Sequence, residues 1–452
     1  MNYILNSEIF LKRIVEIFFL YMILEGVLRK WIFPNFSLQI YFLKDIFLIL
    51  IYLIALKYNL IFKLKFSKFF VFIIILISLY GLTGYDLDYN GIVSYVLGLR
   101  SYWLFLPLFL IVVHVYDKKD LVKFLKFNLY FIIPYFILTY LQSYLPETSF
   151  LNSGFDGMQM NKERPAGYFT YTTQNTYYFL FLFFCFCSYV LSKKEFLYGE
   201  IVFLVLLNFL LISIMILLKS RAVYSYVMVT VFFSSFYMIF SKQEIKLKSK
   251  KLILIFLVSF ISFIASSKVF FAKEYKYSEV RINTDAYYQM AFVLENSDKK
   301  IILTDISFYD FCSRHSSLCR IINELYFVSA IPKSSITGEG IGAGTVGVVA
   351  YNKTSSFPLG ERENPRIVME LGFLVGSLFV VTKMIVTIIL NIIALKKIRD
   401  EKNLIYIPLL VFISVQILIG PLTYTTSFIS FIFWFSLGLL FSSFKKTNII
   451  NR

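Results

Sequence analysis

The residues of this chain best suited to chemistry lie in one short charged stretch. Glu363, Arg366 and Glu370 are spaced i, i+3 and i+7, so a helix that begins early places them on one face. Pro365 suits the first turn of that helix, which puts Glu363 near its N-terminus, where backbone amides can hold a phosphate oxygen. Within hydrogen-bond reach, a carboxylate can take the proton of an attacking hydroxyl. Glu363 is the preferred base and Glu361 the alternative.

A structural interpretation of the same stretch stays open. Charges at the start of a helix often satisfy one another locally, and Glu370 could serve only to orient Arg366. In the catalytic interpretation, Arg366 takes part in the reaction, because a fixed guanidinium stabilises the negative charge that develops on a leaving group.

Four further cations lie next to apolar segments, on the side of the chain where basic residues are rare. They are Arg100, Arg164, Lys219 and Arg221. A guanidinium is always charged and presents a planar fork of donors that matches phosphate. We expect Arg100, Arg164 and Arg221 to bind a lipid-linked diphosphate, with Lys219 beside Arg221 in one turn. Alternatively, each side chain reaches anionic headgroups or pairs with a nearby carboxylate.

These side chains must be positioned by membrane-spanning helices. The 452 residues are 58% hydrophobic, 19% aromatic and only 16% charged, whereas soluble domains average about 45–50% apolar and about 25% charged. That composition excludes a disordered chain, a collagen-like fibre and a small disulfide scaffold. Apolar runs of about 20 residues predict an all-α polytopic membrane protein with about 12 transmembrane helices. The predicted spans are 14–33, 40–57, 66–84, 95–115, 124–145, 171–191, 200–218, 221–240, 252–270, 367–395, 403–420 and 424–444.

Basic residues mark every second connection between these spans, which predicts that both termini are cytoplasmic. The net charge of +17 is therefore mostly a topology signal and does not indicate nucleic acid. The outer segments are short except for 146–170 and 271–366. The sequence accordingly divides into a membrane domain over 1–270, a large extracytoplasmic loop over 271–366 and a second membrane part over 367–452.

The large loop contains two further candidate features. The glycines of 338–344 could cradle a phosphate with their amides, although a tight turn that returns the loop to the membrane is the favoured interpretation. Cys312 and Cys319 are spaced so that a disulfide is possible, and this is left open. With His315 they supply only three candidate ligands, so no metal site is predicted.

Three motifs in this order resemble the O-antigen ligase/polymerase-like family, whose Wzy-type members polymerise oligosaccharide repeat units. The motifs are Arg164-Pro-Ala-Gly-Tyr-Phe169, then Gly338-Glu-Gly-Ile-Gly-Ala-Gly344, then Glu363-Asn-Pro-Arg366-Ile-Val-Met-Glu370-Leu-Gly372 with Gly376 after it. The resemblance covers most of the chain in topology and about 40 residues in motif.

The resemblance implies glycosyl transfer from an undecaprenyl-diphosphate donor, on the outer face of a bacterial cytoplasmic membrane. It also implies a fold similar to multi-span lipid-donor glycosyltransferases, no cofactor and no metal. The implied partners are lipid-linked glycans, membrane lipids and a regulator of polysaccharide chain length. In the ligase branch a His-Asn pair precedes the Glu-x-Gly helix. Here Glu363-Asn364 stands near that position, and the only histidines are His114 and His315, which favours a polymerase. The alternatives are an O-antigen ligase and a flippase for the same lipid-linked sugars.

Overall fold

The computed structural model describes residues 2–62, 67–86, 88–154, 159–160, 162, 164–192, 196–220, 223, 227, 327–352, 363–401, 405–420, 422–423 and 427–444. Within them the chain is almost entirely helical, and the only extended pairing is an isolated bridge between Ser153 and Gln159. The α-helices are α1 (Asn2–Val27), α2 (Ser37–Lys57), α3 (Ser67–Leu82), α4 (Tyr89–Trp103), α5 (Leu106–Val115), α6 (Lys118–Tyr130), α7 (Ile132–Tyr144), α8 (Thr172–Ser192), α9 (Tyr198–Leu217), α15 (Val346–Asn352), α16 (Glu363–Glu370), α17 (Ser377–Glu401), α18 (Tyr406–Ile419) and α19 (Ser427–Ser442).

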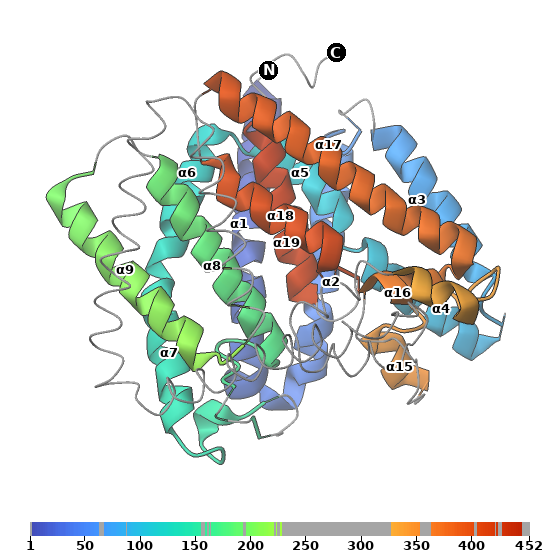
Figure 1. Ribbon diagram of the computed structural model, residues 1–452, viewed down its shortest axis with the longest axis horizontal. Helices are drawn as coiled ribbons and strands as arrows, with labels where there is room; N and C mark the ends of the chain where they lie inside the picture. The colour runs from blue at the N-terminus through green and yellow to red at the C-terminus, as the bar shows by residue number, and fades with distance from the viewer. Residues whose placement is uncertain are drawn as a thin grey trace, which may run out of the picture.

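Shorter helical pieces join these helices. They are η1 (Leu28–Ile32), η2 (Pro34–Phe36), η3 (Phe150–Asn152), η5 (Phe327–Lys333) and η6 (Gly372–Gly376). The long helices form a bundle, and α15 and α16 lie together towards one edge of it (Figure 1). Contacts between helices pair α19 with α5, α6 with α8, α7 with α9 and α17 with α18.

The apolar helices are those of an all-α membrane protein. Six helical segments are long and apolar enough to cross a membrane, namely Pro34–Lys57, Tyr89–Val115, Lys118–Tyr144, Thr172–Ser192, Tyr198–Leu217 and Gly372–Ile398. Three shorter apolar helices, α3, α18 and α19, coincide with further predicted spans. The predicted spans 221–240 and 252–270, apart from Val223 and Val227, lie outside the described residues, as does the loop as far as residue 326. The count of twelve spans therefore stays a prediction.

Two of the predicted spans are helices broken close to a proline. α4 ends at Trp103 and α5 begins at Leu106, with Pro107 in its first turn, and α6 gives way to α7 at Phe131, three residues before Pro134. Proline removes an amide donor and clashes with the preceding turn, so a break at these points follows from the sequence. Inside a membrane a freed carbonyl needs a donor. At the first break the Tyr52 hydroxyl donates to the Leu104 carbonyl at 2.5 Å.

The core of the bundle is aromatic. Phe19 of α1, Phe124 of α6, Phe181 of α8 and Phe435 of α19 meet with ring centroids 4.8–6.2 Å apart. Lipid tails are as apolar as Leu, so helices in a membrane associate through packing instead of through exclusion of water. Large rigid rings with one edge-to-face and four tilted contacts supply that packing, which gives the abundance of Phe a structural role.

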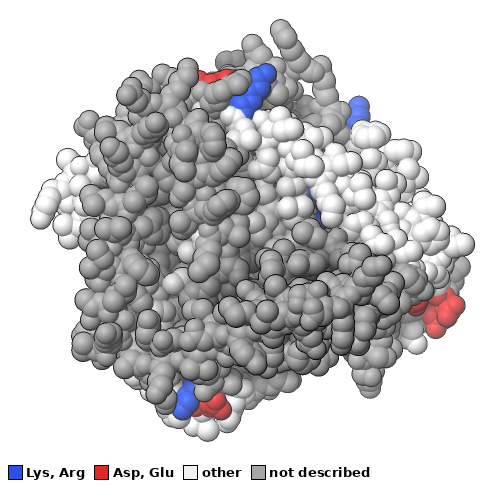
Figure 2. All heavy atoms as spheres, viewed as in Figure 1, with Lys and Arg blue, Asp and Glu red and all other residues white. Residues whose placement is uncertain are grey.

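The outermost helices present apolar side chains to their surroundings. On α17, Leu378, Ile385, Ile388 and Ile392 are each at least half exposed. The described part of the surface in Figure 2, at the right where Figure 1 places α17, is largely free of charged side chains. α8, by contrast, is almost completely buried. α8 is therefore a central helix, and α17 faces lipid.

The turn before α6 gives a first testable prediction. The Asp117 carboxylate accepts from the Asp120 amide at 2.8 Å, and the Asp120 carboxylate accepts from the Asp117 amide at 3.1 Å, which forms a capping box. Partial burial raises the pKa of Asp117, but the amide donors at Asp120 and Lys119 outweigh it and the pKa is lowered. We expect Asp117→Ala to cost about 1 kcal/mol of unfolding free energy, measured as a lower melting temperature in detergent.

The pH dependence of this cap follows from the sign of the pKa shift. A lowered pKa in the folded state stabilises the protein above the unfolded value of about 4. This stabilisation is lost as the pH falls through the folded value. The matched control is Asp117→Asn, which keeps the capping acceptor but does not titrate. Equal melting temperatures for Asp117→Ala and the native protein at pH 7 would rule out the cap.

Candidate functional site

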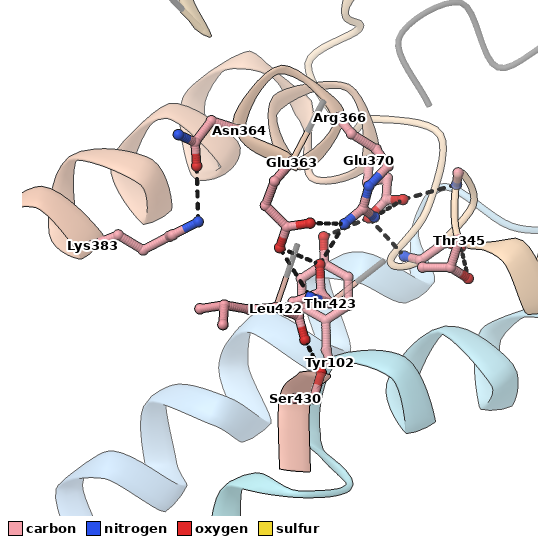
Figure 3. A network of polar contacts seen from close by, with 12 residues as sticks. Tyr102, Thr345, Glu363, Asn364, Arg366, Glu370, Lys383, Leu422, Thr423 and Ser430 are labelled. Carbon is pink, nitrogen blue, oxygen red and sulfur yellow. Dashed lines mark hydrogen bonds and ion pairs between the residues drawn. The ribbon is translucent and has the colours of Figure 1, made fainter. Parts of the chain in front are cut away.

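An ion-pair triad lies at the start of the tenth predicted span. α16 covers Glu363–Glu370, and Glu363, Arg366 and Glu370 lie on one face of it. Arg366 lies between the two carboxylates, with Nη2 2.7 Å from Glu363 Oε2 and Nη1 2.5 Å from Glu370 Oε1. Figure 3 shows the guanidinium directed at both acids. The side chains are 0–1% exposed, so the three charges are enclosed by protein.

Glu370 is held by the glycine-rich segment 338–344. Its oxygens accept from the amides of Gly342 at 3.1 Å and Gly344 at 2.8 Å, and from the Tyr102 hydroxyl of α4 at 2.5 Å. With Arg366 these make four donors, which fills the acceptor capacity of a carboxylate. Glu370 is thus bound as an anion by a backbone cradle, which fits the role of orienting Arg366.

Glycine is required in this segment for two reasons. Gly338, Gly340 and Gly342 have φ of +77°, +100° and +78°, in the left-handed region that favours glycine. A Cβ on Gly342 would also overlap the Gly98 backbone of α4, and one on Gly98 would overlap the Ile341 carbonyl. The segment therefore forms a series of turns against α4. Of the two roles predicted for these glycines, a tight turn and a phosphate cradle, the structure contains the turns. The amides of Gly342 and Gly344 bind the Glu370 carboxylate.

Glu363 accepts hydrogen bonds from the segment that precedes α19. Its Oε1 accepts from the amide of Thr423 at 3.0 Å and from the Thr423 hydroxyl at 2.8 Å, and that hydroxyl also contacts Arg366. Next to it, Asn364 donates to the Leu418 carbonyl at 2.7 Å and accepts from Lys383 of α17 at 2.8 Å. The triad therefore contacts α4, the glycine-rich segment and the approach to α19, and Asn364 joins the same helix to α17 and α18.

The chemical possibilities of the triad differ between its members. All four acceptor positions of Glu370 are filled by donors, so Glu370 suits a positioning role. Glu363 is the carboxylate at the start of the helix, next to residues 353–362, and is the better candidate for proton transfer. Arg366 joins the two and supplies the positive charge. The alternative base, Glu361, lies outside the described residues.

Arg100 does not belong to the triad, although α4 contributes to both sites. Its guanidinium makes a two-pronged contact with Asp45 of α2, at 2.7 and 3.1 Å, and donates to the Tyr41 hydroxyl at 3.2 Å. Tyr102, two residues further along α4, contacts Glu370 instead. The carboxylate pair is the alternative that the sequence left open for Arg100. It does not exclude phosphate binding, because contacts with described residues use three of the five guanidinium donors.

The remaining predicted cations occupy separate places. Arg164 is exposed and begins a turn in which Gly167 has φ +58° and its amide donates to Gln142 at 2.8 Å. Lys219 follows α9 with φ +48°, which is unusual for a residue other than glycine. Arg221 lies outside the described residues, as do Cys312 and Cys319.

A second charged cluster was not predicted from the sequence. It consists of Arg29 after α1, with Glu25 on α1, Lys44 and Asp45 on α2, and Arg100 on α4, and is called here the α2 cluster. Glu25 pairs with Arg29 and with Lys44, each at 3.0 Å. The available signals were the i, i+4 spacing of Glu25 and Arg29 and the adjacent Lys44 and Asp45 inside an apolar run.

The start of α19 links the predicted motifs. Thr423 contacts the triad, Ser427 lies close to Tyr41 beside the α2 cluster, and the Phe428 ring lies 4.4 Å from that of Phe169, the last residue of the Arg164 motif. Five residues of chain span at most about 18 Å. The three regions that were predicted to act together are therefore neighbours across this one segment.

Comparison of the chain with family models, with curated proteins and with solved structures found no match.

Proposed function

We propose that this protein polymerises lipid-linked oligosaccharide repeat units as a membrane glycosyltransferase. The donor is a glycan on undecaprenyl diphosphate, and the acceptor is a sugar hydroxyl of a second lipid-linked glycan. The reaction takes place on the outer face of a bacterial cytoplasmic membrane, with both termini of the chain in the cytoplasm. The product is O-antigen, capsule or exopolysaccharide, and a chain-length regulator is a partner.

In the proposed reaction one bond forms and one breaks. The acceptor oxygen bonds to the anomeric carbon of the donor sugar, and the bond from that carbon to the diphosphate oxygen breaks. Glu363 accepts the hydroxyl proton, and Arg366, oriented by Glu370, stabilises developing charge. The leaving undecaprenyl diphosphate takes the bonding electron pair, and Arg100, Arg164, Arg221 and Lys219 bind it.

The triad is the observation that supports this proposal best. A purely structural helix start needs no second carboxylate in an amide cradle, yet Glu370 is held by two amides, a tyrosine and Arg366. Such preorganisation fixes Arg366 against Glu363 in a site shielded from water. The same arrangement serves a ligase, which differs only in using lipid A core sugars as the acceptor.

A flippase is the second candidate, and two observations favour it. The described spans contain buried charges, among them Lys44 and Glu25, and the broken helices α4–α5 and α6–α7. Transporters place charges and discontinuous helices at a substrate path. An assay that scores bilayer crossing of the lipid-linked unit without formation of a bond separates the two functions.

Glu363→Gln tests the proposed base in cells. Loss of a general base lowers the rate by about 10²- to 10⁴-fold, so we expect single repeat units to replace long polymer, scored by glycan electrophoresis. The matched control is Glu339→Gln, because Glu339 is exposed in the glycine-rich segment, and it should leave chain length unchanged. Native chain length in a stably expressed Glu363→Gln protein would show that Glu363 is not the base.

A further inference from the structure

The α2 cluster surrounds one tyrosine ring with three cations. The charged groups of Arg29, Lys44 and Arg100 lie 4.9, 3.5 and 4.9 Å from the centroid of Tyr41. Lys44 is 1% exposed and Arg29 6% exposed, so two of the three cations are enclosed. A tyrosine ring accommodates cations on its face, but one ring does not neutralise three of them.

Counted over the described residues, the charges of this cluster do not balance. Three cations face two carboxylates, Glu25 and Asp45, which leaves a formal charge of +1. Lys30, next to Arg29, is also buried and donates to the Gly167 carbonyl at 2.9 Å. An uncompensated cation inside a membrane bundle is costly. The cluster therefore favours an additional anion.

One edge of the cluster reaches the lipid-facing side of the bundle. The side chains of Arg100 and Asp45 are 17% and 15% exposed, and the Arg100 guanidinium also lies 5.5 Å from the Phe42 ring. Phe42, Leu43 and Ile46 of α2 are exposed apolar side chains, 41–57% accessible. A ligand whose charged group enters the cluster from this side would have an apolar chain that lies against α2.

We propose that the α2 cluster binds the phosphate group of a membrane lipid, with the lipid chain lying along the exposed face of α2. Arg100 forms the accessible edge of this site and Lys44 and Arg29 its interior, while Asp45 and Tyr41 orient Arg100. Of these residues, only Arg100 also belongs to the set proposed above to bind the diphosphate. Identification of the lipid with the glycosyl donor rests on the proposed function, whereas the binding site itself does not.

Lipid binding by purified full-length protein in detergent tests this inference. Native mass spectrometry would give dissociation constants for undecaprenyl diphosphate, phosphatidylglycerol and inorganic pyrophosphate. We expect Lys44→Met and Arg100→Gln each to weaken binding of the preferred lipid by about tenfold or more. The matched control is Lys12→Gln, which removes a cation paired with Asp120 near the other end of α1, and it should bind as the native protein does.

Asp45→Asn covers the case in which the charge-removing variants fail to fold. It raises the formal charge of the cluster to +2 without changing its shape, so lipid should bind at least as tightly as to the native protein. Weaker binding to Asp45→Asn, or native binding to folded Lys44→Met and Arg100→Gln, would overturn the inference. Inorganic pyrophosphate that binds as tightly as either lipid would also overturn the inference.

The relative affinities identify the source of the phosphate. Preference for undecaprenyl diphosphate identifies the site as part of the donor path, and equal binding of phosphatidylglycerol identifies a site for phospholipid headgroups. Neither result depends on bond formation, so failure of this inference and failure of the proposed polymerase activity are observed in different assays.

Discussion

Arg366→Met is expected to lower the free energy of unfolding by about 3–5 kcal/mol, because it leaves two carboxylates buried without their cation. Glu363 and Glu370 are 2% and 0% exposed, so water cannot replace the guanidinium. Methionine occupies similar volume and adds no polar group, which confines the change to charge and hydrogen bonding. The measurement is unfolding in detergent, followed by loss of helicity with denaturant.

The control for Arg366→Met removes all three charges together. Replacing a whole buried ion-pair network costs far less than removing one partner. The triple variant Glu363→Gln, Arg366→Met, Glu370→Gln removes the three charges and should therefore recover part of the lost stability while remaining inactive. Recovery is incomplete because the side-chain amide at position 370 places a donor against the Gly342 or Gly344 amide. Native stability of the single Arg366→Met variant would show that the triad is not a closed network in the folded protein.

Gly342→Ala is expected to have the second largest effect, a loss of about 2–5 kcal/mol. A left-handed φ costs a residue with a Cβ about 1–2 kcal/mol, and overpacking against the Gly98 backbone adds about 1–3 kcal/mol. Because the Gly342 amide donates to Glu370, the variant should also loosen the triad and reduce polymer formation. Thermal unfolding and glycan length on the same preparation measure both effects.

Gly347→Ala is the matched control for this glycine. It lies five residues further along, and a Cβ at that position meets nothing within 4 Å. Alanine also favours helix, and Gly347 is inside α15. Stability should stay native or rise slightly. If both alanine variants behave alike, the turns of the glycine-rich segment do not support Glu370.

The face shared by Glu363, Arg366 and Glu370 could be predicted because helical spacing alone determines it, and the ion pairs confirm it. The cradle around Glu370 could not. Its donors come from Tyr102, 268 residues away in sequence, and from amides, which every residue except proline carries. Thr423 was missed for the same reason: a hydroxyl in a turn acquires a role only when the fold brings that turn against α16.

The membrane spans could be predicted from the length of the apolar runs, but the charged contacts and the helix breaks inside the spans could not. A span of about 20 residues tolerates one or two charges, so Lys44 and Asp45 did not interrupt the predicted span 40–57. Pairing of Asp45 with Arg100 depends on which faces of α2 and α4 meet. The breaks between α4 and α5 and between α6 and α7 had a local signal, Pro107 and Pro134, which apolar run length does not register.

The most direct test of the central claim is glycosyl transfer by the purified protein in lipid nanodiscs. The substrate is the undecaprenyl-diphosphate-linked repeat unit extracted from the host, and mass spectrometry follows the glycans and the released lipid. The proposed function predicts glycans of two or more units with one undecaprenyl diphosphate released per new bond, and neither with Glu363→Gln. Repeat units that stay single in nanodiscs but cross the bilayer of a proteoliposome would contradict it and would establish a flippase instead.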